Sequence, residues 1–334
     1  MTIAIIGAGA IGSVVAAYLT KAGEDVVLVG RKDQVEAIKK NGLSVAGARG
    51  EENFSVQALT QLDREYDLVI FTVKTQDIEE AWSKNQAFLK KCLVLSSQNG
   101  VQSDTILAKH FGKERLYSSI VMFGATYTKP GEVVFNFEGD WIVGKPFAAN
   151  DESVLKIEQI LKKAFQVTVS ENITGMKWLK LFVNFNNCIP ALAGKSMQET
   201  FADMDLCRLS ISLLKEGLAI VQKNGIQLVS LPKFPAERVY GMANMPLEQA
   251  AGIINKTLTT LSKEPLYGSI LQSIMRGKTS EIDYINGQVL KMVSSASEAP
   301  LNARVVEMVH QVEQRKKYYT VDEIKEAFEL KQKV

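Results

Sequence analysis

The sequence predicts two domains, an amino-terminal α/β domain built on a largely parallel sheet and a carboxyl-terminal all-α domain. Short apolar runs of strand length alternate with helix-like segments over residues 1–170, which is typical of βαβ units. From residue 173 onward these runs end, and apolar residues recur at helical spacing. A chain of 334 residues is also long enough for two domains. We therefore expect one domain over 1–170 and a second over 171–334.

The first strand, turn and helix carry the most informative motif. An apolar run at 3–6 is followed by a Gly-x-Gly-x-x-Gly turn and by an apolar helix-like segment at 14–19. In a dinucleotide-binding turn, the first glycine permits the tight turn, the second lets the backbone approach the pyrophosphate, and the third lets the helix pack on the strand. Glycines also occur in ordinary turns, but here strand, spacing and helix agree. We predict a Rossmann-type domain whose cofactor-binding turn comprises Gly7, Ala8, Gly9, Ala10, Ile11 and Gly12.

The end of the second predicted strand, 26–29, indicates which dinucleotide is bound. Gly30, Arg31 and Lys32 follow this strand. An acidic residue here would bind the ribose 2′-hydroxyl of NAD, whereas a basic residue suits the 2′-phosphate of NADP. Arg31 and Lys32 therefore favour NADP. The alternative is that both are solvated charges at a strand end.

Two later strands bring polar residues to the same edge of the sheet. A helix at 34–40 and a polar stretch with short strand-like pieces lead to a buried run at 68–73, which ends at Lys74. A second run at 93–97 ends at Gln98-Asn99-Gly100. Ligands of open α/β sheets bind beyond the carboxyl ends of strands, so Lys74 is placed for a cofactor phosphate and Asn99 for ribose, nicotinamide or substrate. A surface lysine and a plain Asn-Gly turn are the alternatives.

The last part of the first domain changes character. Pro130-Gly131 separates β-rich pieces between residues 117 and 143, which predicts that the sheet finishes with antiparallel strands. A helix over 151–163 and a strand near 166–170 follow. The second domain is expected to contain helices over 177–192, 203–224, 247–261, 281–297 and 301–314, and a last helix starting at Thr320 with Glu323 in a capping box.

One predicted helix carries polar groups in an apolar segment. At 100° per residue around the helix axis, Asn184 lies about 40° from Lys180 on one side. Asn187 lies about 20° from Lys180 on the other side, whereas Asn186 points elsewhere. A lone lysine on a helix is usually solvated. A lysine with two asparagines on one stripe is instead typical of the wall of a polar cleft.

Glu281 and Ser269 also stand out, although each has an ordinary structural interpretation. Glu281 would complement the dipole in the first turn of a helix, capped by Ser280 and Asp283. Ser269 would cap a helix.

Taken together, these motifs resemble those of the ketopantoate reductases, also called 2-dehydropantoate 2-reductases. The resemblance runs almost end to end, from the Gly7 turn to Trp178-x-Lys180-x-x-x-Asn184 and the segment 269–287. It implies NADPH-dependent reduction of 2-dehydropantoate to (R)-pantoate in pantothenate biosynthesis. It also implies a Rossmann domain joined to an all-α domain like the carboxyl-terminal one of 6-phosphogluconate dehydrogenase, with the active site in the cleft between them.

The resemblance also implies roles for single residues. Lys180 matches the catalytic lysine, acting as general acid, and Glu281 the glutamate that works beside it and contacts substrate or the nicotinamide ribose. Partial burial should lower the pKa of this lysine, and the nearby carboxylate should oppose that shift. Three residues match family positions that orient substrate or cofactor: Asn184, Asn99 and Ser269. Arg31 matches the family's contact to the 2′-phosphate, and Lys74 matches a further phosphate contact.

Three positions depart from the family pattern. Cys188 stands where a second asparagine is common, and Asn187 is a candidate to take its place. Leu266 replaces an asparagine, and Ser273 replaces an aspartate. These changes leave open a different 2-oxo acid as substrate. A further alternative, an NADPH-sensing regulator without turnover, would not need Lys180, Asn184 and Glu281 together.

Composition excludes several other classes. A net charge of +2 argues against a nucleic-acid partner. Three widely spaced cysteines and two histidines without metal-ligand spacing predict neither disulfides nor a metal site. The amino terminus has no basic segment before its apolar run, so we do not expect a signal peptide. We expect a cytoplasmic protein without membrane partners. A homodimer is plausible from the family resemblance alone.

Overall fold

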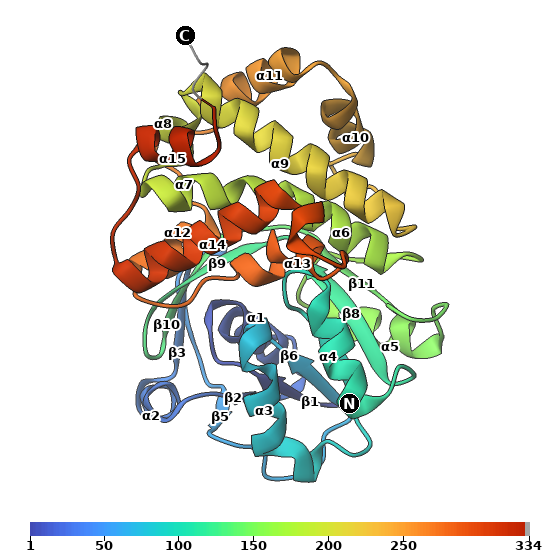
Figure 1. The fold of residues 1–334 in the computed structure, drawn as a ribbon. Coiled ribbons are helices and arrows are strands. Elements are labelled where there is room, and N and C mark those ends of the chain that lie inside the picture. Colours follow the sequence, from blue (N-terminus) through green and yellow to red (C-terminus); the bar gives the residue numbers. More distant parts are fainter. Residues whose placement is uncertain (331–334) are drawn as a thin grey trace. The chain divides into compact units, whose positions relative to one another are not determined.

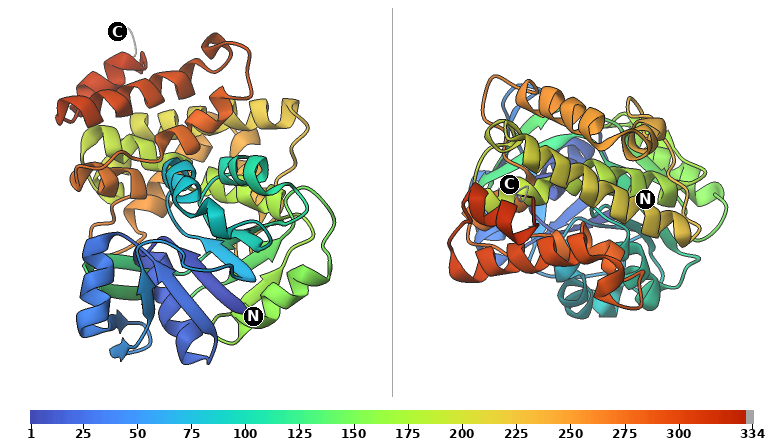
Figure 2. Two further views of the ribbon diagram at one scale, coloured as in Figure 1. Left: turned by 90° about the horizontal axis from the view of Figure 1, so that it is seen from below. Right: turned by 45° about the horizontal axis from the view of Figure 1, so that its top comes forward.

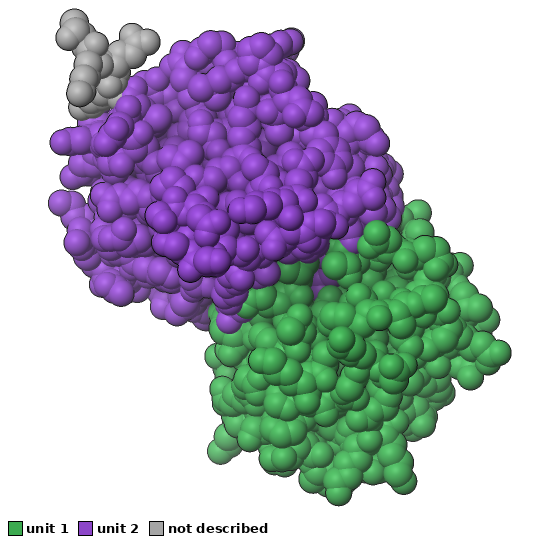
Figure 3. Space-filling view, turned by 45° about the vertical axis from the view of Figure 1, so that its right-hand side comes forward, with its two compact units in different colours: residues 1–174 green, residues 175–334 purple. Residues whose placement is uncertain are grey.

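The computed structural model describes residues 1–330, and the chain divides into two compact units, Met1–Thr174 and Gly175–Val334 (Figure 3). The first unit is α/β and the second is helical, which confirms the predicted fold class. Within the described residues, no helix combines the length and apolar composition needed to cross a bilayer.

An eight-stranded sheet forms the centre of the first unit (Figure 1). Its order is β12-β11-β8-β7-β6-β1-β2-β5, and every neighbouring pair is parallel except β8 and β11. From β1 the chain builds β2 and β5 on one side, then returns to build β6, β7 and β8 on the other, so the topological switch lies between β1 and β6. The strands are β1 (Thr2–Ile6), β2 (Asp25–Val29), β5 (Gln57–Leu59), β6 (Leu68–Phe71), β7 (Leu93–Ser96), β8 (Leu116–Val121), β11 (Trp141–Gly144) and β12 (Val167–Val169).

Helices cover this sheet on both faces, which explains why its strands read as continuous apolar runs. Side chains of β1 alternate between two cores: Ile3 and Ile5 enter one, and Ala4 and Ile6 the other. The helices are α1 (Ala10–Lys21), α2 (Lys32–Asn41), α3 (Ile78–Asn85), α4 (Gln102–Phe111) and α5 (Glu152–Lys162), with short 3₁₀ turns η1 (Thr75–Asp77) and η2 (Gln86–Phe88).

The expected antiparallel ending is only partly found. β11 pairs antiparallel with β8, but the hairpin of β9 (Gly124–Lys129) and β10 (Glu132–Phe137) belongs to a second sheet, with β3 (Leu43–Gly47) and β4 (Glu52–Phe54). α1 contacts this second sheet as well as the first. Because it packs against both, α1 is buried around most of its circumference, and its sequence is apolar all round.

The second unit is a helical bundle in which the long α9 (Met204–Lys223) lies between α11 (Leu247–Thr259) and α14 (Pro300–Arg315) (Figure 2, right). The other helices are α6 (Ile173–Val183), α7 (Cys188–Ala193), α8 (Met197–Phe201), α10 (Ala236–Asn244), α12 (Ser269–Met275), α13 (Gly287–Leu290) and α15 (Val321–Ala327). Three 3₁₀ turns, η3 (Phe185–Asn187), η4 (Ile282–Tyr284) and η5 (Ala296–Glu298), join them. The predicted capping box of Thr320 and Glu323 is confirmed at the start of α15.

The prediction of one helix over 177–192 is wrong. α6 ends before Asn184, and the chain passes through η3 before α7 begins. Pro190 explains the break, since proline lacks the N–H that would bond to residue 186 and its ring crowds that carbonyl. The chain restarts at Cys188, which places Pro190 in a first turn where proline is tolerated.

The prediction of a helix over 281–297 is also wrong. Only η4, α13 and η5 form there. The backbone leaves the helical conformation at Ile285, with φ −111° and ψ −91°. At the other end of the predicted helix, Ser295 caps η5 with its side chain and Glu298 completes that capping box. α10, in the connection that contains Pro232 and Pro235, was not predicted.

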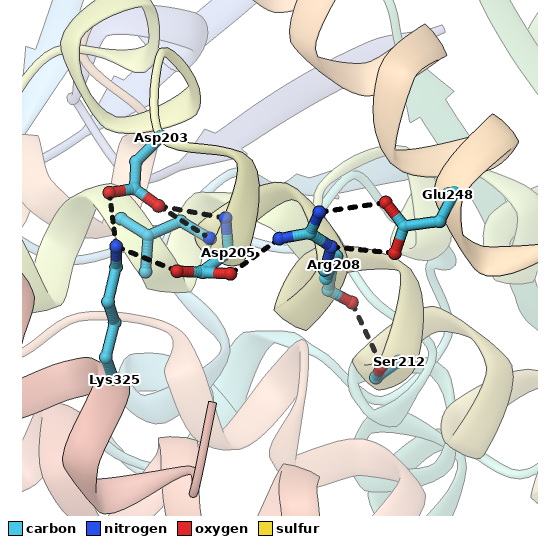
Figure 4. A network of polar contacts seen from close by, with 7 residues as sticks. Asp203, Asp205, Arg208, Ser212, Glu248 and Lys325 are labelled. Atoms are coloured by element: carbon cyan, nitrogen blue, oxygen red, sulfur yellow. Dashed lines mark hydrogen bonds and ion pairs between the residues drawn. The ribbon is translucent and has the colours of Figure 1, made fainter. Parts of the chain in front are cut away.

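A polar network ties three helices of the second unit together (Figure 4). Asp203 caps α9 by accepting from the amides of Asp205 and Leu206. Nζ of Lys325, on α15, lies 2.8 Å from a carboxylate oxygen of Asp203 and 2.9 Å from one of Asp205. Arg208 then joins Asp205 to Glu248 of α11.

Candidate active site

The glycine turn after β1 is held between two neighbouring strands. The Gly7 amide donates to the Val29 carbonyl (2.9 Å), and Thr72 Oγ1 donates to the Gly7 carbonyl (2.8 Å). Gly7 has φ +126°, and a Cβ there would lie 2.5 Å from the Val73 nitrogen. A Cβ on Gly12 would lie only 2.0 Å from the Gly7 carbonyl oxygen. The first and third glycines are therefore required by packing.

Gly9 differs, because a Cβ there would meet nothing within 4 Å. It is the N-cap of α1 and offers no side chain to the first-turn amides, and that turn contains no acidic residue. An open approach to uncapped amides at a helix N-terminus fits a pyrophosphate. The residues Ala8, Ala10 and Ile11 complete this turn.

Sequence reasoning missed the side chains that hold the neighbouring strand ends. Besides its bond to Gly7, Thr72 Oγ1 lies 3.2 Å from the Ile6 carbonyl oxygen. Gln98 is buried, and its Nε2 donates to the carbonyls of Phe71 (2.9 Å) and Val73 (3.0 Å). A polar residue directly after a buried strand was the available signal. These bonds fix the backbone that leads into Lys74.

The remaining predicted cofactor residues of the first unit lie at the carboxyl ends of their strands. Lys74 is the N-cap residue of η1 after β6 and is partly buried. Asn99 follows β7 and is exposed. Arg31 follows β2 as the N-cap residue of α2, with 73% of its side chain exposed and its Nε 4.0 Å from Asp33. Lys32 is more exposed still.

In the second unit, Lys180 lies on α6 and is partly buried. Burial lowers its pKa to about 8, and the positive charge of Lys177 acts in the same direction. The carboxylate of Glu281 opposes both effects, so this carboxylate lies near enough to act on the ammonium group. An ammonium with a lowered pKa is a better proton donor near neutral pH.

Lys177 is a second residue that sequence reasoning missed. Its side chain is 2% exposed, one helical turn before Lys180. Two lysines three residues apart in an apolar segment were the signal in the sequence. Like charges at this spacing repel one another, which is consistent with the effect on Lys180.

The structure brings Asn184, Asn187 and Ser269 together. Nδ2 of Asn187 lies 3.4 Å from Oδ1 of Asn184 and 3.5 Å from Oγ of Ser269. Ser269 does not cap α12, because the N-cap residue is Gly268, where a Cβ would come within 2.7 Å of Asn187 Oδ1. Asn186 points away, toward Ser210 Oγ at 2.5 Å.

The positions that depart from the family pattern lie close in sequence to these polar residues. Cys188 is fully buried next to Asn187, and burial raises the pKa of its thiol to about 12. Leu266 accepts from the Met197 amide (2.8 Å) and donates to Gln198 Oε1 (3.0 Å), while 37% of the residue stays exposed. Ser273 lies on α12 and is partly buried.

Glu281 precedes η4 as its N-cap residue and makes no cap hydrogen bond, so the expected first-turn role in a long helix is not found. It is partly buried. Across residues 1–330, no group of three or more His, Cys, Asp or Glu side chains could hold a metal ion.

Two family models match the chain in sequence. Residues 3–146 match the ketopantoate reductase PanE/ApbA domain, and residues 172–313 match the PanE/ApbA carboxyl-terminal domain. The 2-dehydropantoate 2-reductase of Pyrococcus horikoshii is 33% identical over 307 residues, covering 90% of this chain and 94% of the relative. The enzyme of the same name from Archaeoglobus fulgidus is 30% identical over 289 residues, covering 86% and 89%.

Solved structures share the fold of this chain. A PanE/ApbA family ketopantoate reductase from Ralstonia eutropha superposes with a TM-score of 0.79 at 25% identity, covering 95% of this chain and 99% of the other. A D-mandelate dehydrogenase in complex with NADH and anilino(oxo)acetate has the same fold, with a TM-score of 0.79 at 22% identity and coverage of 94% and 99%. The chain therefore belongs to the ketopantoate reductase family and is an NADP-dependent oxidoreductase.

Proposed function

We propose that the chain reduces 2-dehydropantoate to (R)-pantoate with NADPH, which would place it in pantothenate biosynthesis. The observation that carries this proposal is the environment of Lys180, whose burial and whose neighbour Glu281 act on its pKa in opposite directions. Relatives named for this reaction align over most of their length, which supports the substrate. The proposal assigns cofactor binding to residues 1–170 and catalysis to 171–334.

Lys180 is the proposed general acid. NADPH supplies a hydride to the keto carbon, and the negative charge that develops on the keto oxygen needs a hydrogen-bond donor and then a proton. The Lys180 ammonium provides both. Its pKa of about 8 leaves it largely charged at neutral pH, yet makes it a stronger acid than an ordinary lysine. Glu281 keeps the ammonium form populated despite burial.

The polar group beside Lys180 in sequence is proposed to hold the substrate. Asn184, Asn187 and Ser269 offer amide and hydroxyl groups within one small region. Amide N–H groups and a hydroxyl suit the carboxylate and hydroxyl of a 2-oxo-hydroxy acid. Fixing these two groups orients the keto carbon, which contributes to rate by reducing the entropy lost in the reaction.

The first unit is proposed to hold NADPH. The turn 7–12 would hold the pyrophosphate, Arg31 the 2′-phosphate and Lys74 a further phosphate oxygen. Asn99 would contact ribose, nicotinamide or substrate, and Glu281 the nicotinamide ribose. The guanidinium of Arg31 is exposed, and its Nε lies 4.0 Å from the carboxylate of Asp33. This exposure supports the proposed contact with the 2′-phosphate.

The test is to follow NADPH oxidation by the purified protein with a panel of 2-oxo acids. The proposal expects the highest kcat/KM with 2-dehydropantoate and a clear preference for NADPH over NADH. Turnover of another 2-oxo acid at a much higher kcat/KM would contradict the substrate. Light scattering on the same sample tests the homodimer that the family resemblance suggests.

A second candidate keeps the reaction and changes the substrate to a more apolar 2-oxo acid. Leu266 and Tyr267 are exposed apolar residues just before Ser269, at 37% and 40%. The D-mandelate dehydrogenase with the same fold is named for an aromatic hydroxy acid. Phenylglyoxylate and branched alkyl 2-oxo acids in the panel separate the two candidates.

A further inference from the structure

His310, on α14, lies between two carboxylates. Its Nδ1 is 3.1 Å from Oε2 of Glu313, and its Nε2 is 3.0 Å from Oδ1 of Asp283. About a third of its side chain is exposed, and that of Glu313 is mostly buried. Both ring nitrogens therefore face an acceptor.

This arrangement specifies the protonation state of the ring. An ionised carboxylate only accepts hydrogen bonds, and a neutral imidazole has a single N–H. Only the imidazolium can donate to Glu313 and Asp283 at once. Loss of one proton would leave a ring lone pair facing a carboxylate oxygen, which is repulsive.

The two carboxylates hold the chain on either side of Glu281. The other carboxylate oxygen of Glu313, Oε1, accepts from the Ser280 amide at 2.7 Å, and Ser280 itself is 2% exposed. Asp283 lies two residues after Glu281, on η4. The residue that acts on Lys180 is thus flanked by two positions joined through His310.

We propose that His310 is a positioning residue whose imidazolium, clamped by Glu313 and Asp283, holds the segment 280–283 and so places Glu281 to act on Lys180. We name this set of three side chains the His310 clamp. The inference rests on the proposed role of Glu281 in catalysis. It makes the placement of that carboxylate dependent on pH.

The direction of the pH dependence follows from the pKa of His310. Burial acts to lower this pKa, but the hydrogen bonds to Asp283 and Glu313 outweigh it and raise the pKa above 6.5. Burial acts to raise the pKa of Glu313, and its bonds to Ser280 and His310 prevail and lower it. A raised histidine pKa means that the clamp is complete below 6.5 and is lost as pH rises through the raised value.

Charges from the other elements packed on α14 lie elsewhere. Glu216 of α9 accepts from the amides at the start of α14, about 12 Å along the helix from His310. Glu298 of η5 binds nearby serine amides, and Lys291 lies over the ring of Tyr284 at 5.4 Å. α7 and α13 contain no ionisable side chain other than the buried Cys188. The two clamp carboxylates are the groups that hydrogen-bond to the ring and raise its pKa.

The chain offers a matched control, because its only other histidine, His110, lies on α4 in the first unit against Glu79 and Trp82. Three variants are compared with the wild type. His310→Gln removes the charge, His310→Arg keeps a permanent cation, and His110→Gln is the control. Two readouts are used: amide hydrogen exchange at 280–283 across pH, and the pH profile of kcat/KM with whichever 2-oxo acid is turned over fastest.

Relative to the intrinsic exchange rate at each pH, we expect low protection of 280–283 in His310→Gln at all pH values, and in the wild type only above the His310 pKa. Below the His310 pKa, His310→Gln should lower kcat/KM by about 10-fold, because Glu281 is then misplaced. The deficit of His310→Gln relative to the wild type should shrink as pH rises through the His310 pKa, because the wild type then loses the clamp as well. His310→Arg should retain the clamp above that pKa, whereas His110→Gln should follow the wild type at every pH.

Two outcomes would overturn the clamp. One is unchanged exchange at 280–283 in His310→Gln below the His310 pKa, and the other is changed exchange with a kcat/KM deficit that does not depend on pH. Failure of the proposed function looks different, because 2-dehydropantoate would then not be the preferred substrate while exchange at 280–283 still responds to His310. Similarly, wild-type activity in Glu281→Gln would refute the catalytic role of Glu281 and leave the exchange result standing.

Discussion

Burial of Lys180 acts against its charge, and the carboxylate of Glu281 acts in the opposite direction. If the ammonium group is the general acid, Lys180→Ala should lower kcat by about 10²- to 10⁴-fold. NADPH affinity should stay within about twofold, because that variant leaves the glycine turn intact. Steady-state rates and fluorescence titration with NADPH measure both quantities. Lys195→Ala, an exposed lysine after α7, is the matched control, and a normal rate in Lys180→Ala would make Lys180 structural.

The pH profile tests the same residue without removing it. With a pKa of about 8, the active ammonium form is lost as pH rises through that value, so kcat/KM should fall on the alkaline side. Glu281→Gln removes the charge that raises this pKa, so the alkaline fall of kcat/KM should occur at lower pH. Lys177→Met removes a charge that lowers the pKa of Lys180, so the alkaline fall of kcat/KM should occur at higher pH. Shifts in the same direction for both variants would contradict the electrostatic account.

Cofactor preference is also decided by single residues. Arg31→Ala should weaken NADPH binding by about 10- to 100-fold, because a hydrogen bond between charged groups contributes about 1.5–3 kcal/mol. NADH lacks the 2′-phosphate, so its affinity should change little. Titrations with both cofactors measure the ratio, and Lys39→Ala, an exposed lysine at the other end of α2, is the control. Equal losses for the two cofactors would refute the 2′-phosphate contact.

At the scale of elements, the glycine turn separates packing from binding. Gly12→Ala places a methyl group 2.0 Å from the Gly7 carbonyl oxygen, so α1 must shift, and we expect a loss of about 1–3 kcal/mol in stability. Gly9→Ala meets no atom within 4 Å and should unfold like the wild type.

The same pair should differ in cofactor binding. Gly9→Ala should weaken NADPH binding by about 10-fold, or about 1.4 kcal/mol, because its methyl group would occupy the approach to the α1 amides. Thermal unfolding without cofactor and NADPH titration measure the two effects. A Gly9→Ala variant that is unstable yet binds NADPH normally would reverse this assignment of roles.

How far the sequence predicts an element depends on what competes with its apolar pattern. The strands of the large sheet and helices such as α9 and α14 are predicted because their apolar patterns are clear, and Asp203 also caps α9. The predicted helix over 281–297 breaks at Ile285, whose backbone is not helical, and Ser295 and Glu298 form a separate capped turn at its end. Pro190 broke the helix over 177–192, and the bend after Asn184 helps bring Asn187 toward Ser269.

Part of the candidate site could not be predicted for a related reason. The glycine turn and Lys180 are marked by local spacing, whereas Thr72, Gln98 and His310 act through partners that are distant in sequence. Such partners are set by tertiary packing, which a single sequence does not reveal.

At the scale of the whole molecule, each unit has its own core, so we expect two unfolding transitions, with NADPH raising the one that belongs to the first unit. Lys325→Met tests the second unit, because it leaves the carboxylates of Asp203 and Asp205 without the cation that joins α15 to the start of α9. For partly buried pairs we expect a loss of about 1 kcal/mol, which lowers the midpoint of a unit of this size by about 2–4 °C.

Differential scanning calorimetry of the full chain measures this effect. In Lys325→Met the transition of the second unit should fall, while the transition that NADPH raises should not move. Lys256→Met, an exposed lysine on α11, is the control for loss of a positive charge. Added salt should shrink the difference between wild type and Lys325→Met, because screening weakens partly exposed ion pairs. If the NADPH-sensitive transition fell as well, the two units would unfold cooperatively, and their assignment as independent folding units would be wrong.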